Sequence, residues 1–170
     1  MEIPKPPLVS IWIPVYNGGR FISKAIDSAL NQTYNNIEVV VFDDASKDNT
    51  REVVERYTNL DKRIKYFRTE KNIGINKSFI KILESCSGSL ALFLCADDWI
   101  SRDYIREAVS AFEKNPGIGA VASRVFSIRE RDGEYIFSRE PEISIGSYTR
   151  DWFGKNAYRN FITSMVILGM

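Results

Sequence analysis

A seven-residue apolar stretch, Leu90–Ala96, runs directly into two adjacent carboxylates, Asp97 and Asp98. A continuous apolar run, in contrast to an alternating one, predicts a strand that is covered on both faces, as in the centre of a parallel sheet. Ligands of open parallel sheets bind outside the carboxyl ends of the strands. Because adjacent carboxylates repel each other, we expect a divalent cation such as Mg²⁺ or Mn²⁺ beside them. The alternative is a solvated turn in which Asp98 caps the following helix.

The composition excludes several classes of chemistry. The 170 residues suit one domain with a sizeable core, and the net charge of +1 argues against a nucleic-acid partner. The absence of histidine removes Ser-His and Cys-His catalysis and His-ligated zinc. The two cysteines, Cys86 and Cys95, are too few for a disulfide framework. Neither a signal peptide nor an apolar run of membrane-spanning length is present, so we expect a cytoplasmic protein, with peripheral association at the inner face of the membrane left open.

Strand and helix patterns alternate through the first two thirds of the chain, which predicts βαβ units and a parallel sheet. Strands are expected over Val9–Val15, Ile37–Phe42, Ile64–Arg68, Leu90–Ala96 and Ile118–Phe126. Helices are expected over Phe21–Leu30, Asn76–Cys86 and Asp103–Lys114, and a further helix should begin after Asp48 and Asn49, its expected N-caps. Farther on, we expect a hairpin at Asp132–Gly133, a short helix from Asp151 to Phe153 and a strand from Met165 to Leu168. Right-handed crossovers would bring the polar residues that follow the strands to one edge, namely Tyr16, Asn17, Asp43, Asp44, Asp97 and Asp98.

Five motifs in register resemble the family 2 glycosyltransferases of the GT-A fold, over roughly residues 8–126. They are Val9–Asn17, Ala29–Tyr34, Val41–Thr50, Asn72–Gly74 and Leu94–Trp99. The resemblance implies an α/β, Rossmann-like, mostly parallel sheet flanked by helices, with a small partial β/α extension at the C-terminal end. It further implies a nucleotide-sugar-binding core over 1–128 and a partial acceptor-side region, a hairpin and tail over 129–170, that we expect to be truncated.

The activity implied by this resemblance is metal-assisted, inverting transfer of a sugar from a UDP- or dTDP-type donor to an acceptor hydroxyl, as in cell envelope polysaccharide biosynthesis. The acceptor would be a sugar, a lipid-linked molecule or a protein. Mn²⁺ or Mg²⁺ would stabilise the diphosphate leaving group as a Lewis acid. An inverting enzyme needs a general base, which we expect beyond Met170.

The same resemblance implies roles for individual residues. Asp43 would accept a hydrogen bond from the imino N–H of uracil or thymine, because a carboxylate only accepts. Asp97 would bind the metal, with a supporting contact from Asp98. The remaining donor-binding residues would be Pro14, Tyr16, Asn17, Asp44, Asn72, Gly74, Lys77 and, again, Asp98. A plain polar turn at Asp43–Asp44, and a turn in which Asn17 adopts positive φ, stay open as structural alternatives.

The sequence departs from the family pattern at two of these places. Cys95 stands where relatives often carry an acid, and with no basic partner in view we do not expect it to be a nucleophile. Phe79 stands where many relatives carry an Arg, so Lys77 would have to supply that charge. Two other functions therefore stay open. One is a nucleotide-sugar-binding or interaction domain without catalysis, and the other is a sugar-phosphate nucleotidyltransferase, whose basic glycine-rich loop is not supplied by Tyr16–Arg20.

Overall fold

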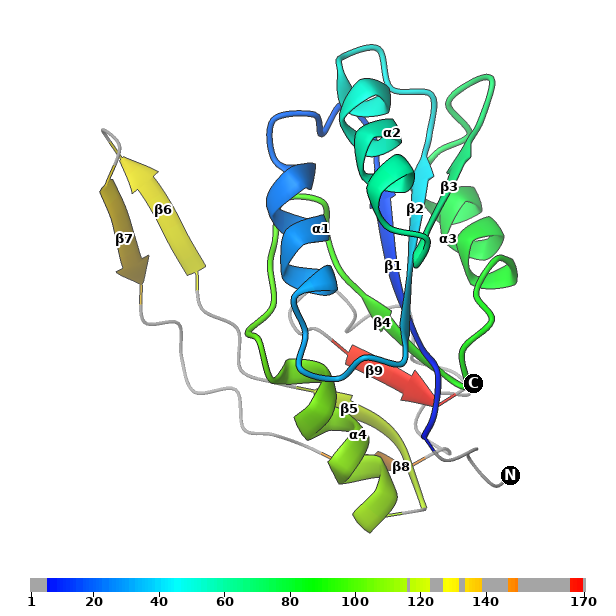
Figure 1. Cartoon of the computed structure of the whole chain (residues 1–170), viewed down its shortest axis with the longest axis vertical. Helices are drawn as coiled ribbons and strands as arrows, with labels where there is room; N and C mark the ends of the chain where they lie inside the picture. The colour runs from blue at the N-terminus through cyan, green and yellow to red at the C-terminus, as the bar shows by residue number, and fades with distance from the viewer. Residues whose placement is uncertain are drawn as a thin grey trace.

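The computed structural model describes residues 6–115, 117–122, 127–131, 134–138, 147–149 and 166–169. A seven-stranded sheet organises the chain, and a separate two-stranded hairpin lies apart from it (Figure 1). The elements in chain order are β1 Val9–Val15, α1 Ile22–Leu30, β2 Ile37–Asp43, α2 Thr50–Leu60, β3 Ile64–Arg68, α3 Ile75–Glu84, β4 Leu90–Phe93, α4 Tyr104–Lys114, β5 Ile118–Ala122, β6 Ser127–Arg131, β7 Glu134–Ser138, β8 Ser147–Thr149 and β9 Val166–Gly169.

The strand order in the large sheet is β3-β2-β1-β4-β9-β5-β8. The first four strands are parallel neighbours, with β1 between β2 and β4. The predicted parallel α/β sheet is therefore confirmed for this half. The other half is antiparallel, because β9 enters between β4 and β5, and β8 pairs with the outer edge of β5. A strand near residues 165–168 was predicted, and β9 confirms it.

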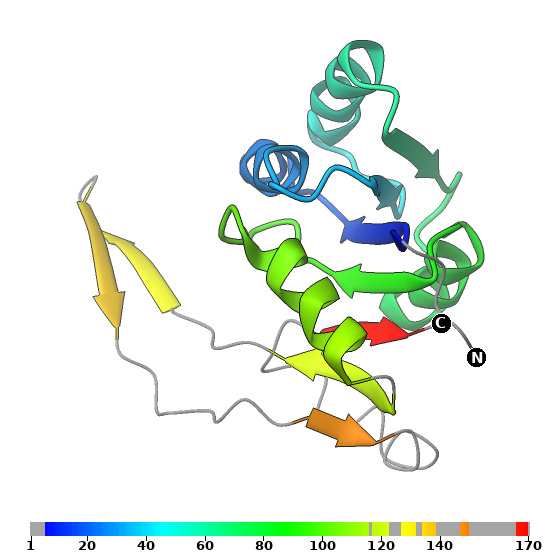
Figure 2. The same ribbon diagram turned by 60° about the horizontal axis from the view of Figure 1, so that its bottom comes forward.

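Two apolar layers cover the sheet, and the alternation along β1 divides them. Ile11 and Ile13 point into a large core built with α1, α2 and α4, whereas Trp12 points to the other face, into a smaller core with α3. Figure 2 shows the same division, with α3 on the side of the sheet away from the other three helices. Leu90, Ala91 and Leu92 of β4 are buried, as the continuous apolar run predicted, and β1 and β2 beside it are buried along almost their whole length.

Several predicted boundaries need correction. The strand predicted over Leu90–Ala96 ends at Phe93, because the chain turns toward the acidic pair, where the N–H of Asp98 bonds the carbonyl of Cys95 at 3.1 Å. The alternative in which Asp98 caps the next helix is wrong, because α4 begins at Tyr104 with Asp103 in the N-cap position. At α2, Asn49 holds the N-cap position without a side-chain bond.

The region after residue 117 is described only in part. β5 confirms the start of the strand predicted over Ile118–Phe126, whereas residues 123–126 lie outside the described ranges. The predicted hairpin is confirmed by the pairing of Arg131 with Glu134, although the turn residues 132–133 lie outside the described ranges. The short helix predicted over 151–153 also falls outside them. Among the described helices, none combines the length and the apolar character that crossing a membrane requires.

Candidate active site

Three loops meet at the carboxyl edge of β1, β2 and β4. The N–H of Gly18, in the loop after β1, donates to Thr50 Oγ1 at 3.0 Å, at the start of α2. A β-carbon placed on Gly18 would lie 3.6 Å from the β-carbon of Ala96, the residue before the acidic pair. The structure therefore brings the loop after β1 next to both the loop after β2 and the segment that leads to Asp97, as the parallel topology predicted.

Side chains of the loop after β2 hold the backbone of the loop after β1. The N–H of Asn17 donates to Ser46 Oγ at 2.9 Å, and Asn17 Oδ1 accepts from the N–H of Lys47 at 2.8 Å. The φ of 54° at Asn17 matches the turn considered from the sequence, since Asn tolerates this left-handed region. Pro14 is half-buried, whereas Tyr16 is 48% exposed and faces solvent beside this turn. The loop thus presents a preformed polar and aromatic rim.

Asp48 fixes the start of α2 to the same rim. Its carboxylate accepts from the N–H of Gly19 and from the N–H of Thr50, both at 3.0 Å, and from the Thr50 hydroxyl. Burial alone would raise the pKa of Asp48, but these hydrogen bonds outweigh it and the pKa is lowered. The carboxylate of Asp48 is therefore a structural part of the rim and stays charged at neutral pH.

Asp43, the last residue of β2, is completely buried and fully engaged. Its Oδ1 accepts from the N–H of Ser46 at 2.7 Å, and its Oδ2 accepts from the Tyr66 hydroxyl at 2.7 Å and from Arg68 at 3.0 Å. Burial, and then the bond to Asp43, raise the pKa of Tyr66 to about 12. The base contact predicted for Asp43 stays a prediction, and this geometry adds a condition. Because the side chain is 0% exposed, a ligand can touch the carboxylate only after a group that covers it moves, and Tyr66 and Arg68 are two such groups.

Asp44 organises the turn between β3 and α3. Its carboxylate accepts from the N–H groups of Ile73 and Gly74 at 2.8 and 2.9 Å and from the Thr69 hydroxyl at 3.0 Å. Gly74 has φ 84° and ψ 155°, a conformation open to glycine and strained for other residues. Asn72 Oδ1 accepts from the same Gly74 N–H at 3.0 Å. Asp44, Asn72 and Gly74 are therefore brought together as one turn.

Phe79 and Cys95, the two residues that depart from the family pattern, lie in different surroundings. Phe79 is half-buried and packs against the smaller core, edge-on to Trp12 at 5.1 Å and next to Phe93 at 5.2 Å between ring centroids, so this side chain supplies packing and no ligand-binding charge. Lys77, in the first turn of α3, is exposed. Cys95, by contrast, lies in the acidic cluster itself.

Cys95, Asp97 and Asp98 form that cluster. One ligand atom of each, the sulfur and two carboxylate oxygens, lies within 4.8 Å of the other two. Burial of the carboxyl group raises the pKa of Asp98, and the charge of Asp97 raises it further. Burial, followed by the two carboxylates, raises the pKa of Cys95 to about 12, so the thiol is protonated and unreactive, in line with the sequence prediction.

The donor set fits a divalent cation. Mg²⁺ and Mn²⁺ typically take one or two protein carboxylates and complete their shell with water and phosphate oxygens. Asp97 and Asp98 are both exposed residues and supply two carboxylates at the carboxyl edge of the sheet, although neighbouring atoms partly shield the Asp98 carboxyl from water. A cation there would replace the repulsion that raises the pKa of Asp98 by an attraction.

The sequence reasoning missed Tyr66 and Arg68. Both lie on β3, paired with Val41 and Asp43 of β2 in the parallel ladder. Arg68 also donates to the carbonyl of Ser46 at 2.8 Å, and its side chain is 32% exposed. One feature of the sequence could have pointed to them: Tyr66 and Arg68 are two positions apart, which puts both side chains on the same face of the predicted strand. Of the ion pair with Asp43, Arg68 is the partner that a ligand can reach.

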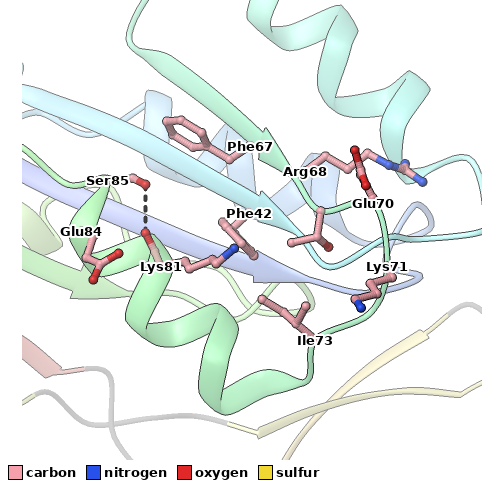
Figure 3. A pocket seen from close by; sticks show the side chains of 10 residues that line it. Phe42, Phe67, Arg68, Glu70, Lys71, Ile73, Lys81, Glu84 and Ser85 are labelled. Carbon is pink, nitrogen blue, oxygen red and sulfur yellow. Dashed lines mark hydrogen bonds between the residues drawn. The ribbon is translucent and has the colours of Figure 1, made fainter.

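A cleft of about 600 Å³ opens behind this network, between β3 and α3. Figure 3 shows Phe42 and Phe67 on the sheet opposite Lys81 and Glu84 on the helix, with Ile73 at one end. The cleft shares Arg68, Thr69 and Ile73 with the hydrogen bonds around Asp43 and Asp44. Its lining includes none of Cys95, Asp97 and Asp98. The lining residues are Phe42, Phe67, Arg68, Thr69, Glu70, Lys71, Ile73, Lys81, Glu84 and Ser85.

Solved structures share this fold. The mannosyltransferase PcManGT from Pyrobaculum calidifontis, in complex with GDP-Man and Mn²⁺, superposes with a TM-score of 0.64 at 29% identity over 70% of this chain and 35% of that protein. S. aureus TarS, in complex with UDP-GlcNAc, superposes with a TM-score of 0.62 at 28% identity over 66% of this chain and 33% of that one. The fold is accordingly the α/β GT-A fold that the motifs predicted.

Sequence comparison agrees. The TuaG protein of Bacillus subtilis, described as a teichuronic acid biosynthesis glycosyltransferase, is 30% identical over 94% of this chain and 62% of its own length. This chain spans smaller shares, 18%, 41% and 44%, of three other curated relatives. The sequence model of Glycosyl transferase family 2 matches residues 10–167. The chain therefore belongs to glycosyl transferase family 2.

Proposed function

We propose that this chain binds the donor of a glycosyltransferase that moves a sugar from a UDP- or dTDP-type nucleoside diphosphate to an acceptor hydroxyl. The observation that carries the proposal is the meeting of three loops at one sheet edge, where Ala96, the residue before Asp97 and Asp98, lies next to Gly18 in the loop that carries Tyr16 and Asn17. The S. aureus neighbour holds UDP-GlcNAc and the Pyrobaculum calidifontis neighbour holds GDP-Man with Mn²⁺, which supports a nucleotide-sugar donor and a divalent metal.

In the proposed arrangement, Asp97 and Asp98 would hold Mn²⁺ or Mg²⁺, which would supply Lewis-acid stabilisation of the negative charge on the diphosphate leaving group. The exposed ring of Tyr16 stacks on the base, and Asn17 and Pro14 complete its wall. The turn of Asp44, Asn72 and Gly74 closes the other side, with Lys77 at its margin.

The part of Asp43 in this proposal is conditional. It accepts the imino N–H of the base if Tyr66 or Arg68 releases one carboxylate oxygen. Otherwise Arg68, the exposed partner, contacts the nucleotide and Asp43 only holds it in place.

The proposed acceptor and product are supported by the names of the relatives and by no contact within the described part of the structure. The name of TuaG supports a role in cell envelope polysaccharide synthesis, with a sugar, lipid-linked or protein acceptor. The same proposal includes a cytoplasmic location at the inner face of the membrane and transfer with inversion at the anomeric carbon. It also divides the chain into a donor core over residues 1–128 and an acceptor-side region over 129–170. No described residue of this chain is assigned as the general base.

A thermal-shift screen tests the proposal. UDP, dTDP, CDP and GDP, each with and without Mn²⁺, are added at about a hundred times the dissociation constant, where a bound ligand stabilises the fold by roughly 2.7 kcal/mol. We expect UDP or dTDP to raise the melting temperature in the presence of Mn²⁺. If Asp43 contacts the base, CDP should fail to do so, because cytosine lacks the imino N–H. Equal shifts with all four nucleotides would refute base selection, and no shift with any would refute donor binding.

A further inference from the structure

The motif Ala29–Tyr34, at the end of α1, contains a buried amide that the donor site does not use. Gln32 is 5% exposed, whereas glutamine is mostly exposed in folded proteins. Its Nε2 donates to the carbonyl of Ser101 at 2.7 Å and to the carbonyl of Ser28 at 2.9 Å, and its Oε1 accepts from the N–H of Ile105 at 3.0 Å. Both ends of the amide are therefore bonded, and they join α1 to the segment that follows the acidic turn.

Gln32 belongs to a row of side chains on one face of α1. Lys24, Ser28 and Gln32 are four residues apart, which places them one above the other along the helix. The Ser28 hydroxyl accepts from the N–H of Ile100 at 3.2 Å, and Lys24 Nζ lies over the ring of Trp99, 3.4 Å from its centroid. The segment between β4 and α4 runs along α1, where it meets this row (Figure 1). Helix α1 therefore holds the segment from three successive turns.

The other end of the acidic turn is fixed by the sheet. The N–H of Leu94 donates to the carbonyl of Trp12 in β1 at 3.1 Å, and the N–H of Asp98 closes the turn on the carbonyl of Cys95 at 3.1 Å. Asp97 and Asp98 thus lie between an anchor on β1 and an anchor on α1. Backbone bonds set the first anchor, whereas side chains of α1 set the second.

We infer that Gln32 and Ser28 are positioning residues, which set the position of the Asp97 and Asp98 carboxylates by holding the chain that follows them. The inference rests on the metal site of the proposed function. Without the anchor on α1, the acidic turn would be held at one end only, and its two like charges would move apart. A turn that is already ordered binds a cation more tightly, because less ordering has to accompany binding.

Asn31, the neighbour of Gln32, provides a matched control. Its Nδ2 donates to the carbonyl of Asp27 at 2.9 Å, four residues back along α1, as Gln32 Nε2 donates to the carbonyl of Ser28. Asn31 is exposed. Asn31→Leu therefore removes the same kind of bond within the helix as Gln32→Leu does, but leaves the bonds between Gln32 and the segment after the acidic turn in place.

The first measurement uses the whole chain without metal or nucleotide. Amide hydrogen exchange, followed residue by residue by nuclear magnetic resonance, is read at Asp98, because its N–H bonds the carbonyl of Cys95 and not a group on α1. Gln32→Leu and Ser28→Ala should each speed up exchange at Asp98 at least about fivefold, since each removes a bond that closes the segment. Asn31→Leu should leave it unchanged.

The second measurement is calorimetry of UDP binding with and without Mn²⁺. Gln32→Leu and Ser28→Ala should reduce the gain in UDP affinity from Mn²⁺ by about tenfold, the lower end of the effect of groups that orient metal ligands. The UDP affinity without Mn²⁺ should stay the same. A general loss of stability would not produce this split, and circular dichroism verifies that each variant folds.

Unchanged exchange at Asp98 in both variants would overturn the inference, and so would an equal effect of Asn31→Leu. Faster exchange with an undiminished gain from Mn²⁺ would also overturn it, because the anchor on α1 would then hold the turn without helping to bind the cation. If Gln32→Leu fails to fold, Ser28→Ala decides both measurements. Absence of UDP binding by the unchanged chain would refute the proposed function, and exchange at Asp98 would still decide whether α1 sets the position of the turn.

Discussion

Replacing one buried carboxylate by an amide, Asp43→Asn, should destabilise the fold by about 2–4 kcal/mol. Asp43 is 0% exposed and accepts from Ser46, Tyr66 and Arg68. The amide nitrogen of Asn cannot accept a hydrogen bond, so at least one of these donors loses its partner. The charge-assisted bond from Arg68 is the largest single loss.

The size of the effect follows from the unequal exposure of the two partners. Breaking a fully buried ion pair costs about 3–5 kcal/mol, because a buried charge is left uncompensated. The Arg68 side chain is 32% exposed and can turn to water, which lowers the estimate. The loss of hydrogen bonds to a buried charged group, about 1.5–3 kcal/mol each, sets the lower end of the range.

Urea denaturation monitored by circular dichroism measures the difference, and Glu55→Gln is the matched control. Glu55 pairs with Arg51 at 2.7 Å, but the two side chains are 45% and 61% exposed. The same acid-to-amide change there should therefore cost about 0.5 kcal/mol or less. If Asp43→Asn were as mild as Glu55→Gln, the network around Asp43 would not support the fold, and the reasoning would be wrong.

Two further predictions concern the opposite edge of the sheet. Burial alone would raise the pKa of Glu38, but bonds from Lys65, Ser10 and the N–H of Ser87 outweigh it and lower the pKa. The folded-state pKa of Glu38 is thus below the unfolded value, so the ionised Glu38 stabilises the fold at pH values above the unfolded pKa, and this contribution disappears as the pH falls through the folded pKa. Glu38→Gln should therefore reduce the loss of stability at acid pH, measured by denaturation curves at several pH values. An unchanged loss of stability would contradict this prediction. Gly88→Ala should destabilise the fold by several kcal/mol, because its β-carbon would lie 2.6 Å from the carbonyl oxygen of Leu8, whereas Gly117→Ala has open space and should change the melting temperature little.

Local patterns predicted most of the elements near the site. The mostly apolar runs that end at Val15 and Phe42, together with the intervening helical spacing, were enough to predict parallel βαβ units and the edge where the loops meet. The positive φ of Asn17 was considered from its chemistry and from the two glycines that follow it. These features depend on residues close in sequence, which is why a pattern reveals them.

Contacts across strands could not be predicted in the same way. That Arg68 meets Asp43 depends on the register between β2 and β3, and no residue in either segment specifies that register by itself. The insertion of β9 between β4 and β5 joins segments more than forty residues apart and reverses the local strand direction. Burial of Asp43 was also unexpected, since an acid at the end of a strand usually reaches solvent.

The central claim is that Asp97 and Asp98 hold a cation which helps to bind a nucleoside diphosphate at this edge of the sheet. Calorimetry of UDP binding with and without Mn²⁺, for the unchanged chain and for Asp97→Asn, tests it most directly. We predict that Mn²⁺ tightens UDP binding at least tenfold, about 1.4 kcal/mol, in the unchanged chain and has no effect in Asp97→Asn. Equal UDP affinity with and without Mn²⁺, or a full Mn²⁺ effect in Asp97→Asn, would contradict the account.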